Sequence, residues 1–93
     1  MKTPPPGDRL AVLRRRIDAV DRRIVRLLTR RQRIVAAMKP FKSRLRDLRR
    51  EAAILRLVVR QAERAGLDRA FVGAVYRALL GASRALQKRA ARG

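Results

Sequence analysis

One long apolar pattern runs through the first forty residues of this chain, and it constrains the fold more than any other feature. Aliphatic residues recur there in alternating steps of three and four, which places them on one face of an α-helix. Arg31 occupies the one position of this seam where an apolar residue is missing. The spacing predicts a single helix over about residues 9–39, which Pro40 should end or kink. The seam consists of Leu10, Leu13, Ile17, Val20, Ile24, Leu27, Ile34 and Met38.

The length of this helix predicts how the chain assembles. A helix over residues 9–39 is about 46 Å long. A compact domain with the 93 residues of this chain is only about 30 Å across. The helix must therefore project beyond such a domain, and its seam continues along the projecting part. We expect a second copy of the chain to cover that part in a two-fold homodimer.

Two shorter helices are predicted after the long one. The second covers about Asp47–Ala65 and ends at Gly66; Asp68 caps the third, as Asp8 is expected to cap the first. The Pro-rich residues 1–7 are expected to form a flexible arm, and residues 8–93 one domain. The predicted class is all-α with three helices. Residues expected to face inward are Ile54, Leu55, Val58, Ala62 and Ala65 on the second helix, and Val72, Val75, Leu79, Ser83, Leu86 and Ala90 on the third.

Charge and composition exclude several classes of function. The chain has 26 Lys and Arg against 7 Asp and Glu, a formal net charge of +19, so it should attract nucleic acid and other anions. With only 3% aromatic residues it lacks the rings that stack on bases, so we expect only non-specific contact with nucleic acid. The absence of Cys and His excludes zinc sites built from them, thiol nucleophiles and a histidine base. No membrane span or signal peptide is evident, which favours a cytoplasmic location.

Arg31 is the first candidate for binding a ligand. Burying it without an anionic partner would be costly. Glu51 or Asp47 could supply that partner, or an anionic ligand could. If the helix continued to Lys42, that side chain would lie about 20° around the helix from Arg31 and about 16 Å along it. The two could then bind one small anion. Arg14 is about 25 Å from Arg31, so it could reach that ligand only from a partner chain.

The other two helices also carry polar residues on or beside their inward faces. Asp47, Arg50 and Glu51 share one face of the first turn of the second helix. Arg50 could simply pair with one of the two acids there. Ser83 and Gln87 form an i, i+4 pair on the third helix, where Ser83 could instead bond to its own backbone. Polar groups from three helices thus point toward the core of one bundle.

Taken in order, these residues resemble the all-helical class of chorismate mutases over about residues 9–90. The resemblance implies an intertwined homodimer of three-helix chains, in which the long helix is shared between two equivalent active sites. The matching motifs are Leu13-Arg14-x-x-Ile17-Asp18-x-x-Asp21, Leu27-Leu28-x-x-Arg31, Lys42, Asp47-x-x-Arg50-Glu51, Gly66-Leu67 and Ser83-x-x-x-Gln87.

The implied reaction is the intramolecular rearrangement of chorismate to prephenate, with no metal or cofactor. A site accelerates it by holding the reactive conformer and by stabilising charge on the breaking ether oxygen. By resemblance, Arg31 and the partner's Arg14 bind carboxylates of the substrate. Lys42 and Gln87 donate to the ether oxygen, and Glu51 accepts from the ring hydroxyl. The carboxylate end is completed by Asp47, Arg50 and Ser83.

Other functions stay open at this point. The isochorismate-pyruvate lyases share this fold and several of the same residues, but they lack a pair like Arg50–Glu51, which favours the mutase. The connection from Lys42 to Asp47 also looks shorter than in typical mutases. An amino-substituted chorismate is another possible substrate. A non-catalytic basic helical module that binds nucleic acid or a partner protein is the alternative from a different class.

Overall fold

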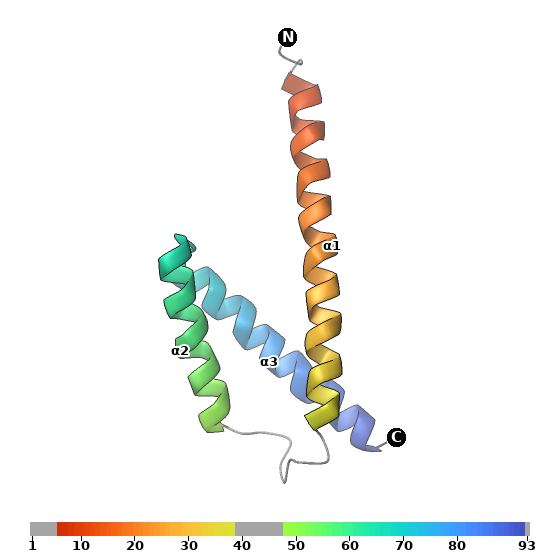
Figure 1. Cartoon of the computed structure of the whole chain (residues 1–93), viewed down its shortest axis with the longest axis vertical. Helices are drawn as coiled ribbons and strands as arrows, with labels where there is room; N and C mark the ends of the chain where they lie inside the picture. Colours follow the sequence, from red (N-terminus) through yellow and green to blue (C-terminus); the bar gives the residue numbers. More distant parts are fainter. Residues whose placement is uncertain (1–5, 39–47, 93) are drawn as a thin grey trace. The chain divides into compact units, whose positions relative to one another are not determined.

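The computed structural model describes residues 6–38 and 48–92, with side chains for residues 7–38 and 48–90 (Figure 1). Three helices are present: α1 (Pro6–Met38), α2 (Leu48–Ala65) and α3 (Arg69–Arg92). No strand occurs in these ranges, so the predicted all-α class with three helices is confirmed. The chain divides into two compact units, Met1–Lys39 with α1 and Pro40–Gly93 with α2 and α3.

The ends of α1 follow from its two flanking prolines. Pro6 is the first helical residue; a proline suits this position because its missing N–H would have no helical acceptor there. Asp8 therefore lies inside the first turn, and its predicted role as N-cap was wrong. In the first turn its carboxylate still interacts favourably with the positive end of the helix dipole. The helix ends at Met38, two residues before Pro40. This end is expected because a proline disfavours the helical conformation of the residue that precedes it.

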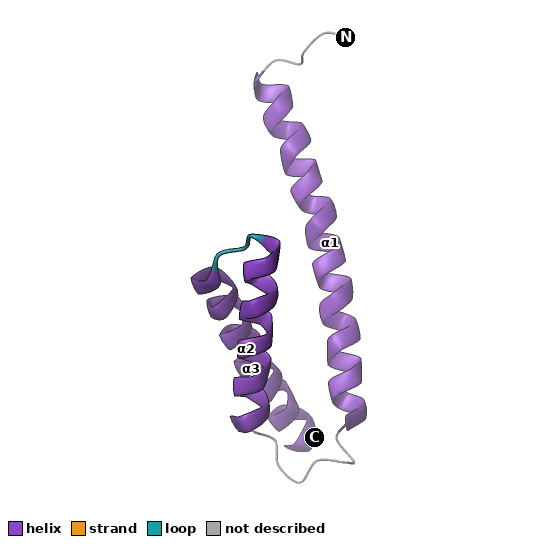
Figure 2. Ribbon diagram, turned by 60° about the vertical axis from the view of Figure 1, so that its left-hand side comes forward, coloured by secondary structure: helices purple, strands orange, loops and turns teal. Residues whose placement is uncertain are grey.

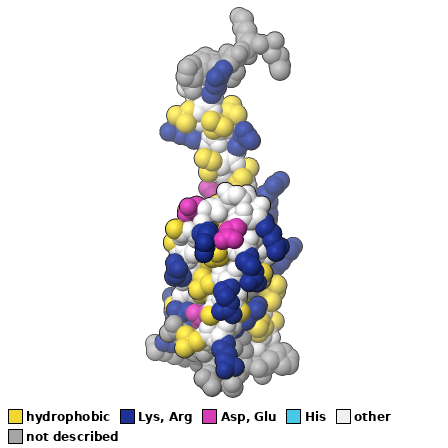
Figure 3. Space-filling model, turned by 90° about the vertical axis from the view of Figure 1, so that its left-hand side faces the viewer, with side chains coloured by type: hydrophobic (Ala, Val, Ile, Leu, Met, Phe, Trp, Pro, Cys, Tyr) yellow, Lys and Arg dark blue, Asp and Glu magenta, His cyan; other side chains and the backbone are white. Residues whose placement is uncertain are grey.

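The apolar seam of α1 is exposed in the single chain. All of its eight residues are exposed, from 40% for Met38 to 59% for Leu27. Hydrophobic side chains accordingly show at the surface of the N-terminal part of α1, between arginines (Figure 3). Among the residues described, no helix is both long and apolar enough to cross a membrane.

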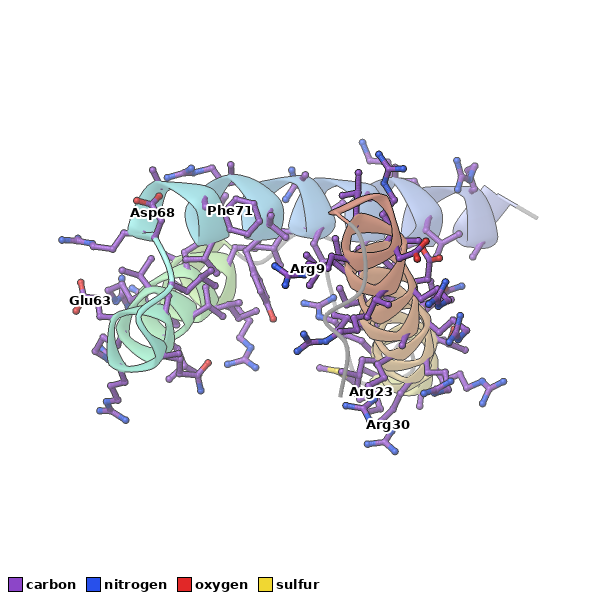
Figure 4. All side chains as sticks on the ribbon, turned by 90° about the horizontal axis from the view of Figure 1, so that it is seen from above. Arg9, Arg23, Arg30, Glu63, Asp68 and Phe71 are labelled. Carbon is purple, nitrogen blue, oxygen red and sulfur yellow. The ribbon has the colours of Figure 1, made fainter. Side chains whose placement is uncertain are left out.

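A tight turn joins α2 to α3 and reverses the chain (Figure 2). Gly66 has a φ of 75°, and its N–H donates to the Glu63 carbonyl at 3.2 Å. The Leu67 N–H donates to the Ala62 carbonyl at 2.8 Å, which completes a Schellman motif. Asp68 Oδ1 then accepts the Phe71 N–H at 2.8 Å, at the start of α3 (Figure 4). The predicted stop at Gly66 and the predicted cap at Asp68 are both confirmed.

A narrow stripe of side chains holds α2 and α3 together. The buried cluster between them consists of Val58 and Ala62 on α2 and Val72 on α3. Leu80 of α3 is buried as well. Ala65, Val75 and Ala90 are exposed, so their predicted inward position was wrong. Two packed helices bury only the rows that meet. On α3 the row through Val72 and Tyr76 is in contact with α2, whereas the apolar pattern also fitted the neighbouring row through Val75. Partly buried residues beside this stripe are Ile54, Val59 and Tyr76.

We expect Gly66→Ala to lower the free energy of unfolding by about 1 kcal/mol, because a Cβ is disfavoured in the left-handed region. No atom lies within 4 Å of a Cβ built on Gly66, so the effect would come from the backbone alone. Gly7→Ala is the matched control, since its Cβ also meets nothing within 4 Å and the residue is helical. Urea unfolding should show no loss for Gly7→Ala. Equal losses in the two variants would contradict this explanation.

Candidate active site

The candidate residues lie on all three helices, as the sequence indicated. Lys42 and Asp47 lie outside the residues that the structure describes. The structure shows the other six in their helices: Arg14 and Arg31 on α1, Arg50 and Glu51 on α2, and Ser83 and Gln87 on α3.

On α1, Arg31 fills the gap in the exposed seam and is half-buried, whereas Arg14 is exposed. Both belong to one uninterrupted helix. They are therefore about 25 Å apart along its axis, with directions that differ by about 100°. Two side chains so placed on a rigid helix cannot hold one small ligand together. This supports the inference that any site using both residues takes them from different copies of the chain.

On α2, Glu51 points to the side that packs against α3. It lies in the first turn of α2, where a negative charge interacts favourably with the helix dipole. Its Oε1 accepts a hydrogen bond from Arg84 Nη1 of α3 at 2.5 Å. Only 18% of the Glu51 side chain and 28% of the Arg84 side chain are exposed. The pair is charge-assisted and shielded from water, so it ties the start of α2 to the C-terminal half of α3.

This contact brings several candidate residues into one region. Ser83 and Gln87 are half-buried and one helical turn apart on α3, and Arg84 lies between them in the sequence. Glu51 is consequently held against the same segment of α3. The region combines a carboxylate acceptor, a hydroxyl and an amide that can donate without changing its charge. In the described ranges, no group of three or more acidic, His or Cys side chains could hold a metal ion.

Arg84 was missed in the sequence, where it belongs to none of the matching motifs. A signal was present nevertheless. Glu51 precedes Ile54 and Val58 at helical spacing, so it falls on the stripe of α2 that faces α3. A half-buried acid on this stripe needs a cation from the opposite helix. The contact seen for Glu51 is with Arg84, whereas the sequence had suggested Glu51 as a partner of Arg31.

We expect the Glu51–Arg84 pair to stabilise the fold of the α2–α3 unit. A double-mutant cycle with Glu51→Gln and Arg84→Met should give a coupling energy of about 1 kcal/mol in urea unfolding. The control is a cycle on Glu63 and Arg69, a second ion pair of the same unit at 3.1 Å whose side chains are 49% and 72% exposed. Its coupling should stay below about 0.5 kcal/mol. A Glu51–Arg84 coupling no larger than that of the control would contradict a structural role for the pair.

A comparison with known protein families identifies the family of the chain. The family model of chorismate mutase type II matches residues 13–88, which is most of the chain and includes all of α2. Searches of curated proteins and of solved structures gave no match. The matched range contains Arg14, Arg31, Glu51, Ser83 and Gln87. The chain therefore belongs to the chorismate mutase type II family and is an enzyme, an isomerase with chorismate mutase activity.

Proposed function

We propose that the chain converts chorismate to prephenate by an intramolecular rearrangement, in an intertwined homodimer with two equivalent sites. One structural observation carries the assignment of the site. Glu51 is held by Arg84 against the segment of α3 that contains Ser83 and Gln87. Residues of two helices far apart in the sequence thus form one polar region within a chain that belongs to this family.

The reaction needs orientation and electrostatic stabilisation. Chorismate carries two carboxylates, and negative charge grows on its ether oxygen as the carbon–oxygen bond breaks. The guanidinium groups of Arg31 and of the partner's Arg14 would bind carboxylates with paired hydrogen bonds and hold the reactive conformer. Lys42 and Gln87 would donate to the ether oxygen, where a fixed donor stabilises the transition state more than the bound substrate. Both bonds that change lie within the substrate, so this scheme uses no metal or cofactor.

Glu51 would accept a hydrogen bond from the ring hydroxyl of the substrate. Arg84 occupies one of its two oxygens, Oε1, and a carboxylate has a second oxygen that can accept. Arg84 is therefore a positioning residue in this proposal, because it fixes the carboxylate without contacting the substrate. The carboxylate end of the site would be completed by Asp47, Arg50 and Ser83.

The homodimer is supported by two independent features of α1. Its seam is 40–59% exposed along eight residues, and a second copy of the same seam would bury these side chains. The separation of Arg14 and Arg31 along one helix also requires two chains if both bind one substrate. Covering the seam and completing the site would then be one event.

The biological setting follows from the same proposal. Prephenate formation is a step toward aromatic amino acids in the shikimate pathway, and we place it in the cytoplasm. Residues 8–93 would form the catalytic domain. Pro6 and Gly7, which were expected in the flexible arm, belong to α1.

We expect Arg31→Ala and Lys42→Ala each to lower the rate of prephenate formation by at least about 10²-fold, the usual effect of losing one fixed donor. Arg30→Ala is the control for Arg31, since Arg30 is the preceding residue on α1 and is exposed. It should keep its activity. Steady-state assays on folded variants provide the measurement. Turnover near that of the unmodified chain in both Arg31→Ala and Lys42→Ala would overturn the site assignment.

We expect two inactive variants, Arg14→Ala and Arg31→Ala, to restore activity when they are refolded together. In a mixed dimer, one site keeps both arginines and the other loses both. Random pairing should therefore recover about a quarter of the normal activity. Each variant refolded alone provides the control. Activity that stays at the level of the separate variants would contradict a site shared between two chains.

A further inference from the structure

The arginines of α1 are arranged on its surface in a way that the proposed reaction does not use. This helix contains ten Arg and three Asp. With about 100° between successive residues, seven of the arginines fall within an arc of about 120°. We call this set the outer arginine face; it consists of Arg15, Arg16, Arg22, Arg23, Arg26, Arg30 and Arg33.

The outer arginine face is exposed and undiluted by acids. All of its members are exposed, and Figure 4, which looks along α1, shows Arg23 and Arg30 on the same side of the helix. Between residues 15 and 33, only Ala19 shares the arc with them. Asp18 and Asp21 fall outside the arc. In the described ranges, the ion pairs Glu51–Arg84 and Glu63–Arg69 lie on α2 and α3. The positive charge of this face is thus left for an external partner.

Four arginines of this face remain open when the seam is covered. Arg15, Arg22, Arg26 and Arg33 lie within an arc of about 40°, centred about 160° from the middle of the apolar seam. They are therefore on the opposite side of α1 from the side chains that a second copy would bury. Assembly through the seam and binding through these arginines do not compete.

The shape and chemistry of this face fit a phosphate backbone. Seven guanidinium groups lie along about 27 Å of straight helix, and guanidinium binds phosphate through paired hydrogen bonds. Duplex DNA presents one negative charge per about 1.7 Å, and its major groove is wide enough to admit an α-helix. The described part of α1 contains no aromatic side chain that could stack on bases. We propose that the outer arginine face binds the backbone of double-stranded nucleic acid without sequence preference.

The test compares two variants of equal net charge, measured by fluorescence anisotropy with a labelled DNA duplex. In the first, Arg15, Arg22, Arg26 and Arg33 are replaced by Gln. In the second, four exposed arginines of the other unit are replaced by Gln. The first variant should reduce the slope of log affinity against log salt concentration by about 3 to 4, since each lost phosphate contact removes about 0.9. The second should reduce it by less than about 1. The arginines replaced in the second variant are Arg56, Arg60, Arg64 and Arg77.

Further measurements separate this proposal from the catalytic one and from loss of folding. Replacing the same four α1 arginines by Lys keeps the charge and should keep most of the affinity. The variant with Gln at the four α1 positions should also retain chorismate mutase activity. A failure of the DNA-binding proposal can therefore be distinguished from a failure of the catalytic proposal. Equal effects of the two Gln variants would overturn the proposal, because binding would then depend on total charge alone. The proposal would also be overturned, in favour of a membrane surface, if the four Gln substitutions on α1 weakened binding to phosphatidylserine vesicles more than binding to DNA.

Discussion

The exposed seam of α1 is the constraint on which the rest of the account depends. Eight large apolar side chains on one 33-residue helix are 40–59% exposed, and burying each of them would stabilise the protein by about 1 kcal/mol. Arg31 is part of this same seam. A partner helix that covers the seam would surround Arg31, which the proposal places on a carboxylate of the substrate. In this proposal, assembly and substrate binding are linked through one helix face.

The sequence was most informative where local chemistry determines the structure. Gly66 and Asp68 were correctly predicted as the end of α2 and the cap of α3, because each requires a particular residue type at one backbone position. Prediction failed where the result depends on another helix. The apolar pattern of α3 fitted two adjacent rows, and packing against α2 buried Val72 and left Val75 exposed. Arg84 escaped notice for the same reason, since its role appears only when Glu51 faces it.

Arginine has two different roles in this chain. Arg84 is partly shielded and bound to one carboxylate at 2.5 Å, so its charge is used inside the fold. The outer arginine face of α1 is open to water, and its charge acts at a distance on anions in solution. Composition alone cannot separate these roles, because both contribute equally to the net charge of +19. Position on a helix separates them, since only one face of each helix packs.

The most direct test of the central claim is the loss of chorismate absorbance in the ultraviolet after the purified protein is added, followed by identification of the product. The account predicts that chorismate disappears and that prephenate is the sole product. A folded protein that leaves chorismate unchanged would contradict the account. Turnover of isochorismate with release of pyruvate in place of prephenate formation would contradict it as well and assign the chain to the lyase reaction.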